Sequence, residues 1–568
     1  MKISSAIISI FLIAFSISGC QNKKPKVTVN LEDLDLLRGE ITRCGGGDFG
    51  EVSFALSCNV DIRQTFDLAI SLLHSFEYEE AEKAFVKVID ADPECAMAYW
   101  GVAMSNFHAL WLQSGTDYLE KGAKVLKIAS STAKEEREKA YINALAGFYK
   151  NWETLSHKER LQKYEQEMYK VYQEYSEDKE AAIFYALALL ATADPADRSY
   201  RVQRKSGAIL ESIYPNQPNH PGIAHYIIHN YDYVELAELA LPTARMYAQI
   251  APASAHAQHM PSHIFTRLGL WDESISSNIE STKSALCYSE SIAPDAHWDE
   301  ELHGMDYLVY AYLQIGDNQQ AIAQYEYLKT IRKVFPVNFK VAYTAAAIPA
   351  RIALENKNWE AAANLEKPIL TLDWNMMPWQ ESIVYFARAM GAVRQGDVPT
   401  AQKELANLLA NREQLIQADD AYKANQVHIQ IKIIEAWIAL ANENQSTAIA
   451  LMREAAEMEY STNKHPVTPG EVLPAGELLG DLLMATNQPA EALKAYEYDL
   501  KQHPNRLNGI YGAASAADKT GIKKLATKYF RQLVELTKNA NVDRPEVVEA
   551  KEYLRTLNET SRVAGRES

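Results

Sequence analysis

The most informative residues of this chain are its histidines. There are 14 of them among 568 residues, and eight fall between His220 and His303. Two pairs each span four positions, which places both members on one face of a helix, and the second pair follows the first by 34 residues. These pairs are His225 with His229, and His259 with His263. Because neutral imidazoles bind zinc and copper well, the pairs predict a site for a divalent transition metal.

The 34-residue interval is also the length of a repeat unit built from two helices. In the segment from Gln64 to Pro93, the small residues Ala69 and Ala81 would let helix backbones approach, and the large Phe85 would fill the gap between units. Markers of the same register recur at Ala240, Gly269, Gly316, Trp359, Gly396, Ala448, Gly480 and Gly512. The pattern resembles the tetratricopeptide repeat family over roughly residues 60 to 540. This resemblance implies an all-α solenoid, a right-handed superhelix of helical hairpins.

The resemblance also predicts which surface of the solenoid the histidine side chains line. In tetratricopeptide folds, fixed positions of the first helix of each unit line a concave groove, and both histidine pairs occupy such positions. Further residues that the register places in the groove are His74, Trp100, His108, Asp232, His256, His303 and Asp306. First helices of adjacent units pack roughly 8–10 Å apart, so imidazoles from two of them could converge.

Three interpretations of this surface remain open at the level of sequence. It is a metal site, or a semi-polar groove that holds a protein, peptide or oligosaccharide without metal, or a set of histidines satisfied by carboxylates. The second is favoured, which predicts a scaffold that binds a partner; the alternative is a metal-binding protein or a metal-dependent enzyme. A non-enzymatic role is preferred because the chain has no His-Glu-x-x-His, Gly-x-Ser-x-Gly or Walker sequence, and no catalytic residue can be assigned.

The N-terminus predicts export and a lipid anchor. Lys2 precedes an apolar run that is too short to span a bilayer and ends in Ile17-Ser18-Gly19-Cys20. These four residues resemble the lipobox of bacterial lipoproteins, which implies that Cys20 carries acyl chains such as palmitate and becomes the mature N-terminus. The expected location is the cell envelope, anchored in the outer membrane and facing either side of it. The alternative is an ordinary signal peptide with a chance cysteine.

Several segments also resemble one bacterial, histidine-rich subgroup of the tetratricopeptide family. They are His74-Ser-Phe-Glu-Tyr78, Tyr99-Trp-Gly-Val-Ala-Met104, His220-Pro-Gly-Ile-Ala-His225, His259-Met-Pro-Ser-His-Ile-Phe265 and His465-Pro-Val-Thr-Pro-Gly470. This resemblance implies a fold and little about function. The net charge of −17 argues against binding of nucleic acid, which requires a clustered basic face.

The expected organisation has four parts: a signal peptide (1–19), a tether with a Cys- and Gly-rich segment (20–60), the repeat solenoid (61–540), and a C-terminal helix with a polar tail (541–568). In an oxidising compartment a disulfide can persist, and Cys44 and Cys58 are a plausible pair; two free thiols are nearly as plausible. Two stretches, Leu286–His297 and Tyr460–Pro474, interrupt the repeats, and the second is too rich in proline to be helical.

Overall fold

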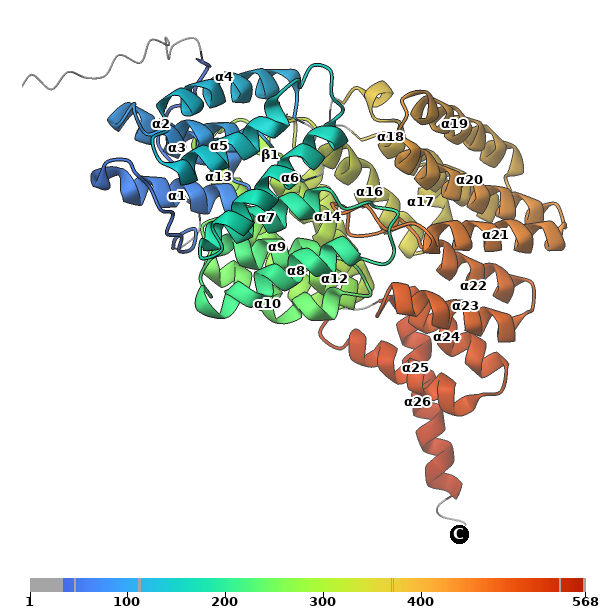
Figure 1. Ribbon diagram of the computed structural model, residues 1–568. Coiled ribbons are helices and arrows are strands. Elements are labelled where there is room, and N and C mark those ends of the chain that lie inside the picture. Colours follow the sequence, from blue (N-terminus) through green and yellow to red (C-terminus); the bar gives the residue numbers. More distant parts are fainter. Residues whose placement is uncertain are drawn as a thin grey trace, which may run out of the picture.

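A computed structural model describes residues 34–44, 47–110, 114–368, 370, 372–540 and 543–564. The predicted signal peptide and Cys20 lie outside these residues. None of the described helices combines the length and apolar character needed to cross a bilayer. The described chain is almost entirely helical, and successive helices form hairpins that stack side by side (Figure 1). The expectation of an all-α solenoid is confirmed.

The first half of the array carries most of the histidines. Its elements are η2 (Val60–Ile62), α1 (Arg63–His74), α2 (Tyr78–Ala91), α3 (Ala96–Ser105), α4 (Thr116–Thr132), α5 (Glu136–Tyr149), α6 (His157–Glu174), α7 (Lys179–Ala191), α8 (Arg201–Ile213), η3 (Tyr214–Asn216), α9 (Pro221–Tyr231), α10 (Ala237–Ile250), α11 (Ala255–His259), α12 (Pro261–Leu268) and α13 (Trp271–Ile292). A capping box begins α6, with Ser156 and Glu159 bonded reciprocally.

The second half continues the same pairing. Its elements are β1 (His297–Trp298), α14 (Asp299–Gln314), α15 (Asn318–Leu328), β2 (Val334–Phe335), α16 (Phe339–Glu355), α17 (Trp359–Ala363), η4 (Trp374–Met376), α18 (Pro378–Arg394), α19 (Val398–Gln417), α20 (Ala421–Ala441), α21 (Gln445–Tyr460), α22 (Ala475–Ala485), α23 (Pro489–Gln502), α24 (Leu507–Lys519), α25 (Lys523–Leu536) and α26 (Pro545–Ala564).

Two local features differ from the sequence reading. The stretch Leu286–His297 is only partly an insertion, because α13 continues through it to Ile292. The short strands β1 and β2, which no alternation in the sequence indicates, pair in parallel after it. The stretch Tyr460–Pro474 is non-helical beyond the end of α21, as predicted.

The inner helices differ in composition from the outer ones. Every residue of α3 and α9 is buried, whereas α4 buries only one stripe of its surface. A helix that is apolar all round belongs in an interior, and an amphipathic helix belongs at a surface. The coil is tight enough that α1 contacts α9, and α14 contacts α24. The inner face is therefore filled by packed helices and is not an open groove.

Two non-repeat segments close this interior. Residues 34–44 and 47–62 run along the N-terminal half, and a disulfide joins Cys44 to Cys287 in α13. A second disulfide joins Cys58 to Cys95 at the start of α3. The expected Cys44–Cys58 pair is thus wrong, because each cysteine meets a partner from the helical array and not its neighbour in sequence.

The second closing segment, residues 461–474, connects α21 to α22 and reaches back to the N-terminal half (Figure 1). Asn463 Nδ2 donates a hydrogen bond to the carbonyl of Pro195, and Tyr307 Oη donates to the carbonyl of Val467. We call this segment the crossing loop.

Candidate metal centre

Six histidines gather in two clusters of three. The first cluster contains His225 and His229 from α9 and His256 from α11, and the second contains His259 from α11, His263 from α12 and His303 from α14. Within each cluster the ligand nitrogens all lie within 4.8 Å of one another. All six were predicted to line the inner face. The two predicted pairs do not share one point; each pair is joined by a third histidine from a neighbouring helix.

The first cluster is ordered by a backbone carbonyl. His225 Nδ1 donates to the carbonyl of His74 over 2.7 Å, which leaves Nε2 as an unprotonated acceptor. That Nε2 lies 2.8 Å from Nε2 of His229 and 3.1 Å from Nε2 of His256. The ring of Phe76 packs against all three imidazoles, with centroid distances of 4.4 to 5.8 Å.

The second cluster is ordered by side chains. His259 Nδ1 donates to Asn278 Oδ1 over 2.6 Å, and His263 Nδ1 donates to Asp232 Oδ2 over 3.0 Å. The orientation of the Asn278 amide is set because its nitrogen donates to the carbonyl of Ser274. The ring of Tyr307 packs against all three imidazoles, as Phe76 does in the first cluster.

These contacts fix the protonation of the second cluster. Both His259 and His263 carry their proton on Nδ1, so two bare Nε2 lone pairs face each other across 3.0 Å. Burial lowers the pKa of each ring, so neither gains a second proton near neutral pH. Two facing lone pairs repel unless a cation lies between them. Two Zn–N bonds of about 2.05 Å at a tetrahedral angle would place the nitrogens roughly 3.3 Å apart, close to the observed separation.

Asp232 supports the second cluster from behind. It also accepts from Arg267 Nε at 2.8 Å and lies 3.8 Å from Lys464 Nζ in the crossing loop. Burial would raise the pKa of Asp232, but Arg267, Lys464 and His263 outweigh it and hold that pKa well below its usual range. An ionised carboxylate behind a ligating imidazole orients the ring and raises its basicity.

Two glutamates lie beside the first cluster. Glu300 Oε2 is 3.8 Å from His256 Nδ1, is buried, and has no hydrogen-bond partner among the described residues, while Oε1 pairs with Lys340. Glu77 accepts from Ser254 Oγ over 2.6 Å at the start of α11. Burial raises the pKa of Glu77 to about 8. A cavity of about 10 Å³, enough for one water, adjoins Glu77 and Ala255.

A third group, His74, Glu180 and His220, also has metal-ligand spacing but is already satisfied. His74 Nε2 and His220 Nε2 donate to the two oxygens of Glu180 over 3.0 and 2.9 Å, and Tyr226 Oη lies 2.9 Å from His74 Nδ1. Burial would raise the pKa of Glu180, but the two histidines outweigh burial and hold that pKa below its usual range. This is a structural network, and it holds the His74 carbonyl that orders the first cluster.

The other predicted groove residues lie elsewhere. Trp100 packs in the core against Phe184. His108 stacks between Tyr78 and Tyr118, and Asp306 pairs with Arg351 in the interior. The expectation that these side chains line an open groove is therefore wrong, because the tight coil and the two closing segments bury the inner face.

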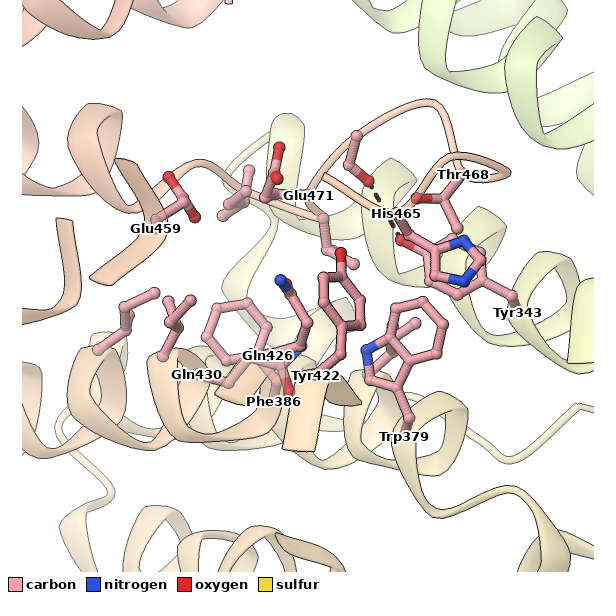
Figure 2. A pocket seen from close by; sticks show the side chains of 16 residues that line it. Tyr343, Trp379, Phe386, Tyr422, Gln426, Gln430, Glu459, His465, Thr468 and Glu471 are labelled. Atoms are coloured by element: carbon pink, nitrogen blue, oxygen red, sulfur yellow. Dashed lines mark hydrogen bonds between the residues drawn. The ribbon is translucent and has the colours of Figure 1, made fainter. Parts of the chain in front are cut away.

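A separate cavity lies under the crossing loop, against α18 and α20. It has room of about 40 Å³ for the centres of water molecules. Figure 2 shows aromatic rings at one end, including those of Trp379, Tyr422 and His465, with the carboxylates of Glu459 and Glu471 along one side. It is distinct from the histidine clusters and contains the His465 motif singled out in the sequence.

Several functional neighbours escaped the sequence reading. Asn278, Glu300, Phe76 and Tyr307 contact the clusters, yet none belongs to a repeated histidine spacing. A signal did exist for Glu300, which precedes His303 by three residues and therefore shares its helix face.

Comparison with known proteins finds a repeat motif in one part of the chain. Residues 66–109 match the family model described as a tetratricopeptide repeat. The APC/C hetero-tetramer Cut9-Hcn1 contains a chain of 14% identity and TM-score 0.32, with 89% of this chain and 79% of that chain covered. The human IFIT1 dimer with m7Gppp-AAAA gives 12% identity and TM-score 0.34, with 89% and 99% covered. No protein with a curated description matches the sequence. Residues 66–109 thus resemble a tetratricopeptide repeat, and the described chain as a whole is a helical array.

Proposed function

We propose that this scaffold is a metal-binding protein of the bacterial cell envelope that holds two transition-metal ions, one in each three-histidine cluster. The observation that carries the proposal is the contact between His259 and His263. Two buried nitrogens that both lack a proton face each other at 3.0 Å, and their Nδ1 atoms are committed to Asn278 and Asp232. A cation turns this repulsive contact into a stable one.

The ligand chemistry favours zinc or copper. Each cluster offers imidazole nitrogens alone, whereas magnesium and calcium prefer carboxylate and carbonyl oxygens. The acceptors behind the rings — the His74 carbonyl, Asn278 and Asp232 — are the kind of outer partners that ligating histidines almost always have. Three protein ligands also leave a fourth coordination position for water or another small ligand.

Metal content of the purified mature protein tests the proposal. After reconstitution with zinc or copper and removal of loose metal, we expect two ions per chain. His229→Gln should remove the ion of the first cluster alone, and His263→Gln that of the second. His428→Gln is the matched control, because His428 lies on α20 outside both clusters. Circular dichroism would verify that each variant stays helical. Substoichiometric metal in the unaltered protein would overturn the proposal.

We further propose that Cys20 is lipidated and anchors the chain in the outer membrane. The sequence Ile17-Ser18-Gly19-Cys20 after an apolar run supports this, and several acyl chains on one residue give stable attachment. Labelling cells with radioactive palmitate tests it: the unaltered chain should take up label and enter the detergent phase, and Cys20→Ser should do neither. Equal labelling of both would contradict the anchor.

A second candidate function is the binding of a protein partner, and one observation favours a particular place for it. Val548 and Tyr553 of α26, with Lys523 of α25, border a groove of about 970 Å³, and Val548 is 60% exposed. Because each inner helix of the array is covered by a neighbouring helix, the occupant that fits is an amphipathic helix of the partner.

Photo-crosslinking in cells tests this candidate. A photoreactive residue at Val548 should yield a specific product, whereas one at Met376, which is also exposed and lies in η4 outside the groove, should not. Identical products from both positions, or none from Val548, would count against it.

A further inference from the structure

The two histidine clusters are neighbours that share helices. The five-residue helix α11 supplies His256 to the first cluster and His259 to the second. These positions are three apart, so their Cβ atoms lie about 5–6 Å from one another. The next inner helix, α14, repeats the arrangement, because Glu300 faces His256 of the first cluster and His303 belongs to the second.

Each cluster has its own aromatic residue and its own acceptors for the Nδ1 atoms. The Nδ1 acceptors His74, Asn278 and Asp232 hold the backs of the rings, so the Nε2 lone pairs point away from them. Phe76 contacts every ring of the first cluster, and Tyr307 contacts every ring of the second. Three imidazoles leave a coordination position free in each cluster, and the shared helices α11 and α14 place the two clusters next to each other.

Glu300 adds a negative charge beside His256 of the first cluster. Its Oε1 is paired with Lys340, but its Oε2 is buried and without a hydrogen-bond partner among the described residues. A buried carboxylate oxygen left unpaired is costly. Two cations in one small space repel each other, so an uncommitted carboxylate beside them is what such a site requires.

We propose that the two three-histidine clusters form a single dinuclear centre whose ions share a small bridging ligand such as hydroxide or azide. This inference rests on the proposed metal-binding function and deepens it. The ligand must be small because five of the six cluster histidines are buried on inner helices.

Copper(II) provides the test, because two copper(II) ions joined by a single bridging atom couple magnetically and lose their electron paramagnetic resonance signal. We expect the reconstituted protein to hold two copper ions per chain yet show only a small fraction of the signal that two separate ions give. Added azide should produce a new azide-to-copper charge-transfer band.

Variants separate the dinuclear arrangement from simple metal binding. His256→Gln and His303→Gln should each leave one ion and restore its full signal, while His428→Gln should remain nearly silent. Two ions per chain with full signal in the unaltered protein would overturn the inference and leave the proposed function standing. Fewer than two ions per chain would overturn the proposed function itself.

Discussion

The Nδ1 atom of His263 donates to a carboxylate oxygen of Asp232 that lies 31 residues earlier in the chain and on the preceding repeat. The contact turns the bare Nε2 of His263 toward His259 and couples the second cluster to Arg267 and the crossing loop. A hydrogen bond between repeats thus decides which nitrogen is free to bind a metal.

The first prediction concerns this carboxylate. Asp232→Asn keeps the shape of the side chain but removes the charge behind His263, so we expect metal affinity at the second cluster to fall by about 10- to 100-fold. Competition with a chelator of known affinity measures the change. Asp397→Asn is the matched control, since Asp397 caps α19 far from the clusters and asparagine caps equally well. Equal metal affinity in the two variants would show that Asp232 does not support metal binding at the second cluster.

The second prediction concerns pH. Burial lowers the pKa of five cluster histidines below the unfolded value of about 6.5; they are His225, His229, His259, His263 and His303. The unfolded chain therefore binds more protons than the native one below that pH, so native stability is full above it and is lost as the pH falls. Each ring contributes up to about 1.4 kcal/mol per pH unit.

Several groups oppose this trend. His503 has a raised pKa because Asp499 and Glu471 outweigh its burial. Burial also raises the pKa of Glu77 to about 8, that of Glu477 to about 7 and that of Glu459 well above its usual range, so these groups stabilise the native state as the pH falls. Five further histidines have lowered pKa values and add to the trend: His74, His108, His157, His428 and His465. The ten lowered rings outnumber the opposing groups and predict a lower urea midpoint for the metal-free protein at about pH 5.5 than at about pH 7.5. An unchanged midpoint would show that the clusters are charged or exposed.

The third prediction concerns Gly222 in α9. A Cβ atom there would lie 2.6 Å from His74 Nδ1, so Gly222→Ala must displace the His74 ring. The backbone carbonyl of the same residue accepts the hydrogen bond that orders His225. We expect a loss of about 1–3 kcal/mol in the free energy of unfolding and weaker metal binding at the first cluster. Gly147→Ala in α5 is the control: its Cβ meets nothing closer than 3.4 Å, and it should gain about 0.5–1 kcal/mol. Similar changes in both variants would contradict this account.

The fourth prediction concerns the disulfides. Peptide mapping without reduction should recover Cys44 joined to Cys287 and Cys58 joined to Cys95. In the chain-entropy treatment, bridges across 243 and 37 residues stabilise by about 5 and about 4 kcal/mol. Cys44→Ser with Cys287→Ser should therefore lower the melting temperature more than Cys58→Ser with Cys95→Ser. Recovery of a Cys44–Cys58 peptide would contradict the structure.

The repeat register of the sequence anticipated the helices and the identity of the six cluster histidines. Residues such as Ala69, Ala81 and Phe85 predicted helix packing correctly, because small and large side chains at a fixed period leave few ways to stack. What the register could not supply was the tightness of the coil. Small rotations at each hairpin accumulate along a solenoid, and only their sum brings α1 against α9 and buries the expected groove.

The pairing of cysteines and of histidines escaped prediction for the same reason. Cys44 meets Cys287 across 243 residues, and His229 joins His256 of the next unit in place of the predicted pairing of His225 with His229 alone. No local spacing encodes such meetings. Asp232 was predicted at the inner face, but its role behind His263 depends on the path of the crossing loop.

The bond between Cys44 and Cys287 has a mechanical consequence. Tension applied to the N-terminal segment would pass from Cys44 through the sulfur atoms to Cys287 and then along the following chain. The intervening residues form a loop closed by a covalent bond, so they bear no load. Five of the six cluster histidines lie in that loop, and only His303 lies beyond it. A chain held by its N-terminus in a moving envelope would keep most of its metal ligands out of the path of the force.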